Sequence, residues 1–265
     1  MVEWTVEEPR VLTVEEAVRA LDVRIVAGRV DVVPTDDEAA RVEVSEIDGP
    51  PVHVRVVDGT LSIAHDDLHW GGILGWARAS IGRRRAVVSV AVPRACDASI
   101  GVVSADAVVA GVAGRLTARC VSGEMVVDGV DGDVRIETVS GDVEVRDVSG
   151  SISLKTVSGG LTVVDGHSER VDAKTVSGDV ALDLQPQAAP TIDIATVSGD
   201  LTVRVPGTTG LDVDVSTTSG EVASGFGELD VTSKPGRKRL RGRVGDGAGR
   251  LRGRSVSGRV ALLSR

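Results

Sequence analysis

Apolar and polar residues alternate in short stretches throughout the second half of the chain. In Asp142–Arg146, Val143 and Val145 fall on one face and the charged residues on the other. A period of two with one apolar face is typical of a half-buried β-strand. Similar aliphatic pairs form two columns along the sequence: Met125/Val127, Val143/Val145, Leu161/Val163, Val180/Leu182 and Leu201/Val203 in the first, and Val134/Ile136, Ile152/Leu154, Val171/Ala173, Ile192/Ile194 and Val213/Val215 in the second.

A constant corner motif separates the two columns. Thr-Val-Ser-Gly occurs at residues 138–141, 156–159, 175–178 and 196–199, and a variant at 217–220, so that the starts differ by 18, 19, 21 and 21 residues. Glycine can adopt a positive φ in such a corner, and Ser and Asp can bond the local backbone. Because no single turn can bury its own apolar face, we predict an all-β, parallel β-solenoid (β-helix or β-roll) with turns of 18–21 residues.

The opposite corner of each turn varies in length. It includes residues 147–150, 165–170, 185–190 and 206–210, and all the growth from 18 to 21 residues occurs there. In repeat proteins, insertions collect on one face, which is often the binding face.

The first part of the chain, residues 1–115, predicts β-strands without a clean repeat, as an irregular N-terminal cap. We expect strands near residues 21–26, 29–33, 41–44, 52–57, 60–64 and 86–92. Thr13–Glu16 matches a capping box and predicts a short helix near 14–20. No segment has the composition of a linker, so we expect one domain, 1–265, with regular repeats in 116–265 and a basic insertion at 234–254.

Composition narrows the class of protein. Hydrophobic residues make up 42%, nearly all aliphatic, with three Trp, one Phe and no Tyr. The formal net charge of −9 favours solubility. We expect Cys96 and Cys120 to be reduced and buried. The N-terminus has no apolar stretch of a signal peptide, and no segment is apolar enough to span a bilayer, so we expect a cytoplasmic protein, with peripheral attachment to a membrane as the alternative.

The stacked Val-Ser-Gly-Asp-Val-x-Val units, clearest over Val121–Gly220, resemble the bacterial putative-adhesin β-strand-repeat family, a domain of unknown function of actinobacterial type. The resemblance extends from Leu21 to the closing Val256–Leu263. It implies a parallel β-helix or β-roll, with extended strands before the repeats and therefore strand rather than helix at 14–20. Some relatives are linked to cell-envelope stress, and the family carries no catalytic residues to transfer.

Two groups of residues could hold a metal. Glu124, Asp142, Asp179, Asp200 and Glu221 follow corner glycines and would stack on one edge, as in a calcium β-roll, but the repeat lacks the glycine-rich loop of that fold. His65–His69 contains four ligand-type side chains without the spacing of a zinc site. We favour solvated turns and an exposed polar loop, and we predict no metal, no cofactor and no catalytic residues.

The stretch from Trp70 to Arg85 combines two Trp with three Arg. One interpretation is an interfacial loop that dips into a membrane or a partner through Trp70, Ile73, Leu74 and Trp76. The other is a packed loop that covers the first sheet, since its glycines weaken any amphipathic helix.

The basic segment Lys234–Arg254 has nine basic residues and one acid, Asp246, so it carries +8 and the rest of the chain −17. We predict contact with an anionic surface such as phospholipid head groups through Lys234, Arg237, Lys238, Arg239, Arg241 and Arg243. The alternatives are a solvated tract or arms that lie against the acidic body. The segment has no aromatic residue for base stacking, which argues against nucleic acid.

We therefore expect a non-enzymatic scaffold or interaction protein with an unknown protein partner and a link to the cell envelope. The rival function is an ion- or carbohydrate-binding module, including the calcium-roll version, or an adhesin. Sugar sites usually offer aromatic platforms, and the repeats over Val121–Gly220 contain none.

Overall fold

The computed structural model describes residues 2–65 and 84–265, and these form 24 strands and no helix. The predicted all-β solenoid is confirmed. The short helix that the capping box indicated near residues 14–20 is wrong, and the strand that the family resemblance implied there is not formed at residues 15–19 either: one strand ends at Val14 and the next begins at Ala20. No described helix is long and apolar enough to cross a membrane. The chain divides into two compact units, Met1–Gly141 and Asp142–Arg265.

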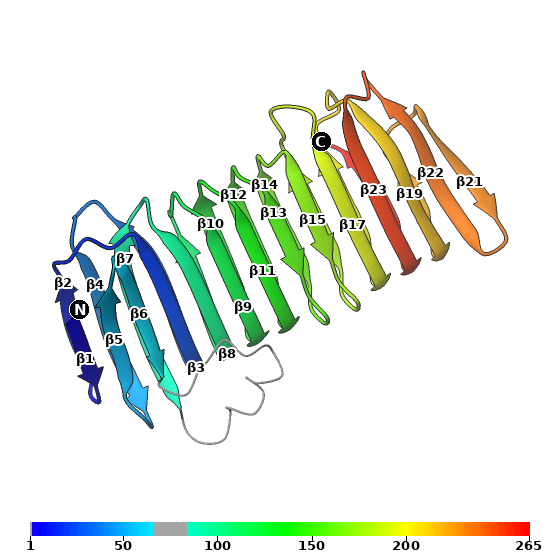
Figure 1. Cartoon of the computed structure of the whole chain (residues 1–265). Helices are drawn as coiled ribbons and strands as arrows, with labels where there is room; N and C mark the ends of the chain where they lie inside the picture. Colours follow the sequence, from blue (N-terminus) through cyan, green and yellow to red (C-terminus); the bar gives the residue numbers. More distant parts are fainter. Residues whose placement is uncertain (1, 66–83) are drawn as a thin grey trace. The chain divides into compact units, whose positions relative to one another are not determined.

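The first unit combines antiparallel pairs with the start of a parallel ladder (Figure 1). Its strands are β1 (Val2–Val6), β2 (Arg10–Val14), β3 (Ala20–Thr35), β4 (Ala40–Asp48), β5 (Val52–Val57), β6 (Thr60–His65), β7 (Arg85–Pro93), β8 (Asp97–Ala110), β9 (Leu116–Ser122), β10 (Met125–Val130) and β11 (Val134–Ser140). The long β3 pairs in parallel with β6 and β7 on one side and with β8 on the other. β8 then pairs in parallel with β9 and β10, and β9 with β11.

The second unit consists of β12 (Val143–Val148), β13 (Ile152–Lys155), β14 (Leu161–Gly166), β15 (Arg170–Lys174), β16 (Val180–Leu184), β17 (Thr191–Ser198), β18 (Leu201–Val205), β19 (Leu211–Ser219), β20 (Val222–Ser224), β21 (Leu229–Lys234), β22 (Arg237–Val244), β23 (Gly249–Ser257) and β24 (Val260–Ser264). One ladder runs β12–β14–β16–β18–β24–β20 and is parallel throughout. The other runs β13–β15–β17–β23–β19 in parallel and ends with the antiparallel β22 and β21, in the order that Figure 1 shows.

The predicted aliphatic columns form the core of the second unit. Val143 pairs with Leu161, Leu161 with Val180 and Val180 with Leu201, and all four side chains are buried. The expectation that Val213 and Val215 stack directly on Ile192 and Ile194 is wrong. β23 lies between β17 and β19, and its Leu251 and Gly253 fill that place in the column. β23 can lie between β17 and β19 because residues 255–258 repeat the corner motif. This motif fits between two turns of the stack as well as after the last turn.

The corner glycines stack so closely that no side chain fits between successive turns. Gly199 has a φ of +139°, and a Cβ added to it would overlap the carbonyl oxygen of Gly178. Gly178 meets Gly159 in the same way, and Gly258 meets Gly199. Positive φ and the close approach of a carbonyl both require glycine, which explains why this corner of the repeat is constant.

We predict that Val203→Asp strongly destabilises the protein. Val203 lies in β18 with 1% of its surface exposed, so an aspartate there would be a buried, unpaired charge and should lower the free energy of unfolding by about 3 kcal/mol or more. The adjacent Thr202 points to the other side of the strand, so Thr202→Asp is the matched control and should change stability little. Thermal denaturation followed by circular dichroism measures both, and equal melting temperatures would show that the register is misassigned.

Candidate interaction surface

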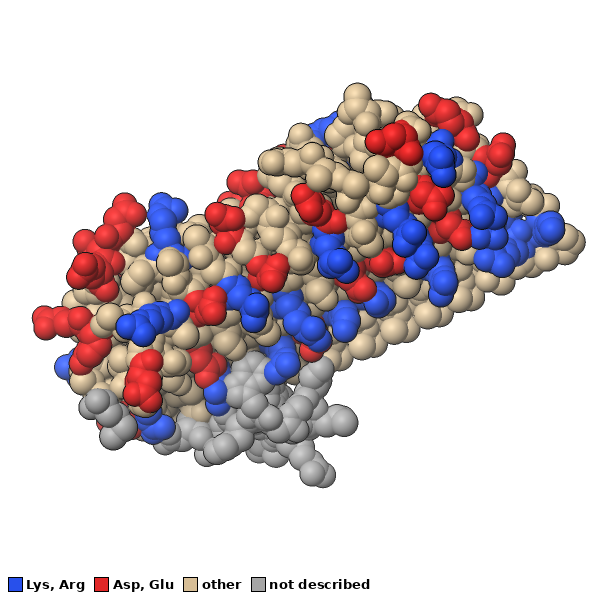
Figure 2. All heavy atoms as spheres, turned by 45° about the horizontal axis from the view of Figure 1, so that its top comes forward, with Lys and Arg blue, Asp and Glu red and all other residues tan. Residues whose placement is uncertain are grey.

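The outer side of four neighbouring strands of the second unit, β17, β23, β19 and β22, carries seven arginines, which come from β22 and β23. Arg237, Arg239, Arg241 and Arg243 come from β22, and Arg250, Arg252 and Arg254 from β23. Three aspartates share this side, Asp193, Asp212 and Asp214, so its net charge is +4. We call these ten residues the basic face. In Figure 2, Lys and Arg side chains gather over the C-terminal strands of this unit.

Strand alternation places the arginines outward. In β23, Leu251 and Gly253 are buried between the exposed Arg250, Arg252 and Arg254. A Cβ at Gly253 would lie 2.9 Å from Cγ1 of Val215, so a larger residue would push against the neighbouring strand. The sequence Arg-Leu-Arg-Gly-Arg therefore satisfies a tight core and a basic surface at the same time.

The register sets opposite charges side by side across the strands. Asp214 of β19 lies between Arg241 of β22 and Arg252 of β23. Asp212 lies in the same way between Arg243 and Arg250. Because the central strand holds only two acids between the arginines of β22 and β23, the face keeps a net positive charge.

Of the seven arginines of the basic face, Arg239 alone forms a side-chain hydrogen bond with a described residue. Arg239 Nε donates to Oδ1 of Asp214 at 2.6 Å, and its Nη2 bonds the other carboxylate oxygen. These bonds, with the charges of Arg239, Arg241 and Arg237, lower the pKa of Asp214 despite its partial burial. The other six arginines form no hydrogen bond or ion pair with a described residue and remain available to a ligand.

A hollow of about 300 Å³ lies at the edge of the basic face. The small Ala195 of β17 lies between Lys174 of β15 and Arg254 of β23, and Asp193 and Arg252 complete the lining. Lys174 Nζ is 2.6 Å from Asp172 Oδ2. The hollow could accept a small anionic group between two cations.

The sequence-predicted basic residues do not all share one side. Most of the segment lies in β21, β22 and β23, so it is not a free arm, and β22 pairs with β19, which holds Asp212 and Asp214. Lys238 points to the opposite side of β22 from the arginines, and Lys234 lies on β21 opposite Arg237. Sequence reasoning left Arg250, Arg252 and Arg254 out of the site, although their strict alternation with small or apolar residues was visible.

Trp70, Ile73, Leu74 and Trp76, the predicted interfacial loop, lie outside the described residues. Of the His65–His69 group the structure describes His65 alone, which is buried at the end of β6. The described residues hold no group of three His, Cys, Asp or Glu placed to bind a metal.

Three of the five acids that follow the corner glycines, Asp142, Asp179 and Asp200, accept backbone hydrogen bonds. Asp142 Oδ1 accepts from the backbone N–H of Gly160 at 2.7 Å, and Asp179 Oδ1 accepts from that of Asp200 at 2.8 Å. Asp200 Oδ1 in turn accepts from the N–H of Arg259 at 2.7 Å. Each carboxylate thus ties its turn to the next one in the stack, a structural role that the sequence analysis missed.

The variable corner of the second unit also forms a hollow. Residues 186–190, Pro206 and residues 208–210 line about 340 Å³ together with Asp246 and Ala248. The backbone N–H of Ala248 donates to Oδ1 of Asp246 at 3.0 Å, so this carboxylate is already hydrogen-bonded within its own turn. The expectation that the insertions share one side of the repeat agrees with this lining.

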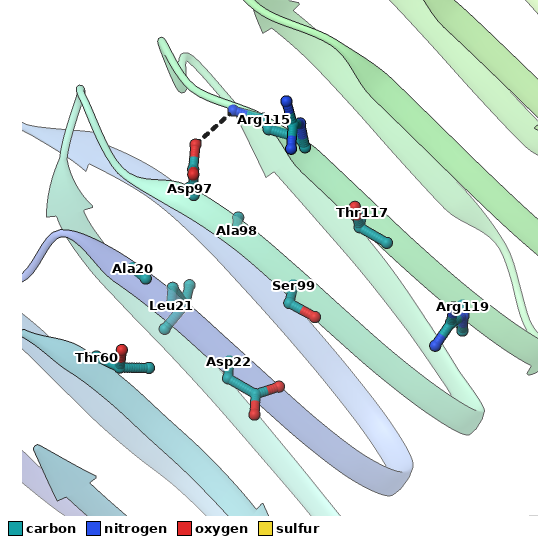
Figure 3. Close-up of a pocket in the computed structure, with 10 residues that line it drawn as sticks. All are labelled: Ala20, Leu21, Asp22, Thr60, Asp97, Ala98, Ser99, Arg115, Thr117 and Arg119. Atoms are coloured by element: carbon teal, nitrogen blue, oxygen red, sulfur yellow. Dashed lines mark hydrogen bonds between the residues drawn. The ribbon is translucent and has the colours of Figure 1, made fainter. Parts of the chain in front are cut away.

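The first unit carries a shallow hollow of about 440 Å³ on the outer side of β3, β8 and β9 (Figure 3). Its floor is made of small residues such as Ala20 and Ser99. Asp97 at the rim accepts a hydrogen bond from the backbone N–H of Arg115 at 2.8 Å, and Asp22 pairs with Arg24. The carboxylates are therefore already bound, which makes this hollow a weaker candidate than the basic face.

Cys96 and Cys120 are free and buried, as expected. Burial raises the pKa of each thiol to about 11. Both therefore remain protonated at neutral pH, where a thiol is a poor nucleophile.

The family model described as Toastrack DUF4097 matches residues 18–262. The chain belongs to the Toastrack family. The match includes nearly all of both units of this Toastrack chain and confirms the predicted kinship with a domain of unknown function. No protein among the curated ones matches it significantly.

Two solved structures of bacterial proteins are similar to this chain. A putative adhesin from Bacteroides fragilis is 11% identical, with 97% of each chain covered and a TM-score of 0.50. A putative cell adhesion protein from Clostridium sporogenes is 11% identical over 97% of this chain and 100% of that one, with a TM-score of 0.26. At 11% identity, the likeness to the Bacteroides fragilis structure is one of fold alone.

We predict that the Toastrack chain neither needs nor binds calcium through its acidic corners. Three of the five carboxylates that would form the ladder already accept backbone hydrogen bonds, and the loop that aims carbonyl oxygens at calcium is missing. Circular dichroism spectra and melting temperatures with a chelator and with added calcium should superimpose. A rise in melting temperature with calcium, or a loss of β signal in chelator, would contradict the structural role of these acids.

Proposed function

We propose that this protein is a non-enzymatic interaction module that contacts anionic phospholipid surfaces through the basic face of its second unit. The observation that carries the proposal is the set of six arginines without a hydrogen bond or ion pair to a described residue, from two strands, on one side of a sheet. Arg237 and Arg254 lie at one end of this set and Arg243 and Arg250 at the other, so the charge extends along the full length of both strands.

The charge is sufficient for reversible attachment. Each basic residue close to an anionic bilayer contributes about 1 kcal/mol, so a net charge of +4 supplies about 4 kcal/mol before any apolar contact. Such binding is weak, and it must weaken further with salt because the Debye length falls from about 10 Å at 0.1 M to about 3 Å at 1 M. A second feature supports the proposal: the flat sheet presents its arginines together without the entropy cost of ordering a loose tract.

An exposed apolar row borders the basic face at the constant corner. Val157, Val176, Val197 and Val256 are each about half exposed, and Val197 and Val256 lie on the adjacent β17 and β23. Residues of this size add apolar contact once the charges bring the face to the head-group region. The row runs across the strands because its residues come from the same position in successive turns.

The direct test is co-sedimentation with vesicles that contain or lack anionic phospholipid, at low and high salt. The variant Arg241→Ala, Arg243→Ala, Arg252→Ala, Arg254→Ala removes the net charge of the face but spares Arg239, which bonds Asp214. We expect its apparent binding constant for anionic vesicles to fall by about 100-fold or more.

The matched control removes four exposed arginines of the first unit, through Arg10→Ala, Arg41→Ala, Arg94→Ala and Arg115→Ala. It has the same net charge as the test variant and should bind anionic vesicles nearly as well as the wild-type protein. If both variants lost the same affinity for anionic vesicles, binding would depend on the net charge of the protein and not on the basic face. If the wild-type protein did not bind at low salt, the proposal would be rejected.

A further inference from the structure

β21 ends the ladder that carries the basic face, and β22 is its one partner among the described strands. Figure 1 shows it as the last strand at that end of the second unit. One edge of its backbone is therefore unpaired. Such an edge is a template for another strand, and natural proteins usually shorten it, cover it or charge it to prevent pairing.

The turn between β21 and β22 determines which backbone groups are free. Pro235 and Gly236 form a two-residue connection, and Lys234 pairs with Arg237 across it. A two-residue connection joins residues that exchange both hydrogen bonds, so Lys234 and Arg237 form such a pair. These pairs alternate along an antiparallel ladder, so Thr232 and Asp230 also bond β22, whereas Leu229, Val231 and Ser233 direct their N–H and C=O groups to the free edge.

The side chains of β21 are those of a strand that lacks a neighbour. Val231 has 54% of its surface exposed, more than any other large hydrophobic residue in the described part of the chain. On the other side of the strand, Asp230, Thr232 and Lys234 are all exposed. The two charges are opposite in sign and lie two positions on either side of Thr232.

We infer that β21 pairs antiparallel with β21 of a second copy of this chain, about a two-fold axis at Thr232. In this register Val231 exchanges hydrogen bonds with Ser233 of the second copy, and both belong to the set with free backbone groups. Asp230 then lies opposite Lys234 of the second copy, and Lys234 opposite Asp230, in the pairs where side chains approach most closely. The register required by the hydrogen bonds is thus the one that satisfies both charges.

Self-complementarity identifies the partner. A strand pairs with both Asp230 and Lys234 only if it has a cation and an anion at mirrored positions, and the identical strand has them. A two-fold contact of this kind closes on itself and gives a dimer rather than a fibre. The axis is perpendicular to the sheet, so the outer sides of both copies face the same way and the dimer would present two basic faces to one surface. The inference does not depend on the proposed function, because strand pairing requires no lipid.

The test is sedimentation equilibrium of the full chain without lipid over a range of concentrations. Asp230→Lys sets like charges opposite each other in the dimer, and so does Lys234→Asp, so each variant alone should weaken dimerisation by at least about 10-fold. An equimolar mixture of the two variants should recover dimers, because each Lys of one chain then faces an Asp of the other. The double variant Asp230→Lys, Lys234→Asp should also dimerise as the wild-type protein does.

Val231→Pro provides an independent variant. It removes a free-edge N–H and leaves the hydrogen bonds to β22 intact, so we expect a folded monomer by circular dichroism and sedimentation. A wild-type protein that stays monomeric at every concentration, or single charge variants that dimerise as tightly as the wild type, would overturn the inference.

Discussion

The contact between corner glycines of successive turns sets the spacing of the second unit. Gly159, Gly178, Gly199 and Gly258 lie one above the other, each so close to the carbonyl of the previous one that a side chain would overlap it. This contact brings neighbouring backbones to the distance of a β-ladder at the corner, where strands usually diverge. The acids beside the glycines reinforce it, since Asp179 and Asp200 each accept an N–H from the next turn.

Once the corners are in register, alternation along the strands determines which side chains of successive turns lie next to each other. Inward positions of successive turns coincide, so that Leu161, Val180 and Leu201 form an uninterrupted aliphatic column. Outward positions coincide as well, and the arginines of β23 and β22 are thereby aligned on either side of the aspartates of β19. The basic face is a product of the same stacking that builds the core, and it needs no dedicated loop or pocket.

The sequence predicted what depends on local pattern. Alternation identified the ten aliphatic pairs of the two columns, all of which are buried, and the repeated Thr-Val-Ser-Gly located the tight corner. It could not show that β23 lies between β17 and β19, because the corner motif at 255–258 is compatible with any neighbouring turn. For the same reason the ion pair of Arg239 with Asp214, and the separation of Lys238 from the other basic residues, became visible only with the register. In the first unit β3 pairs with β6, β7 and β8, and these pairings could not be predicted because no repeated motif marks them in the sequence.

The measurement that tests the stacking most directly is the stability of Gly199→Ala against Gly227→Ala. Gly199 has a φ of +139° and faces the carbonyl of Gly178, whereas Gly227 has no atom within 4 Å of an added Cβ. By thermal denaturation, Gly199→Ala should lose about 2 kcal/mol or more, from backbone strain and the displaced carbonyl. Gly227→Ala should remain close to the wild type. Equal stability of the two variants would contradict the claim that the glycine corner holds the turns together.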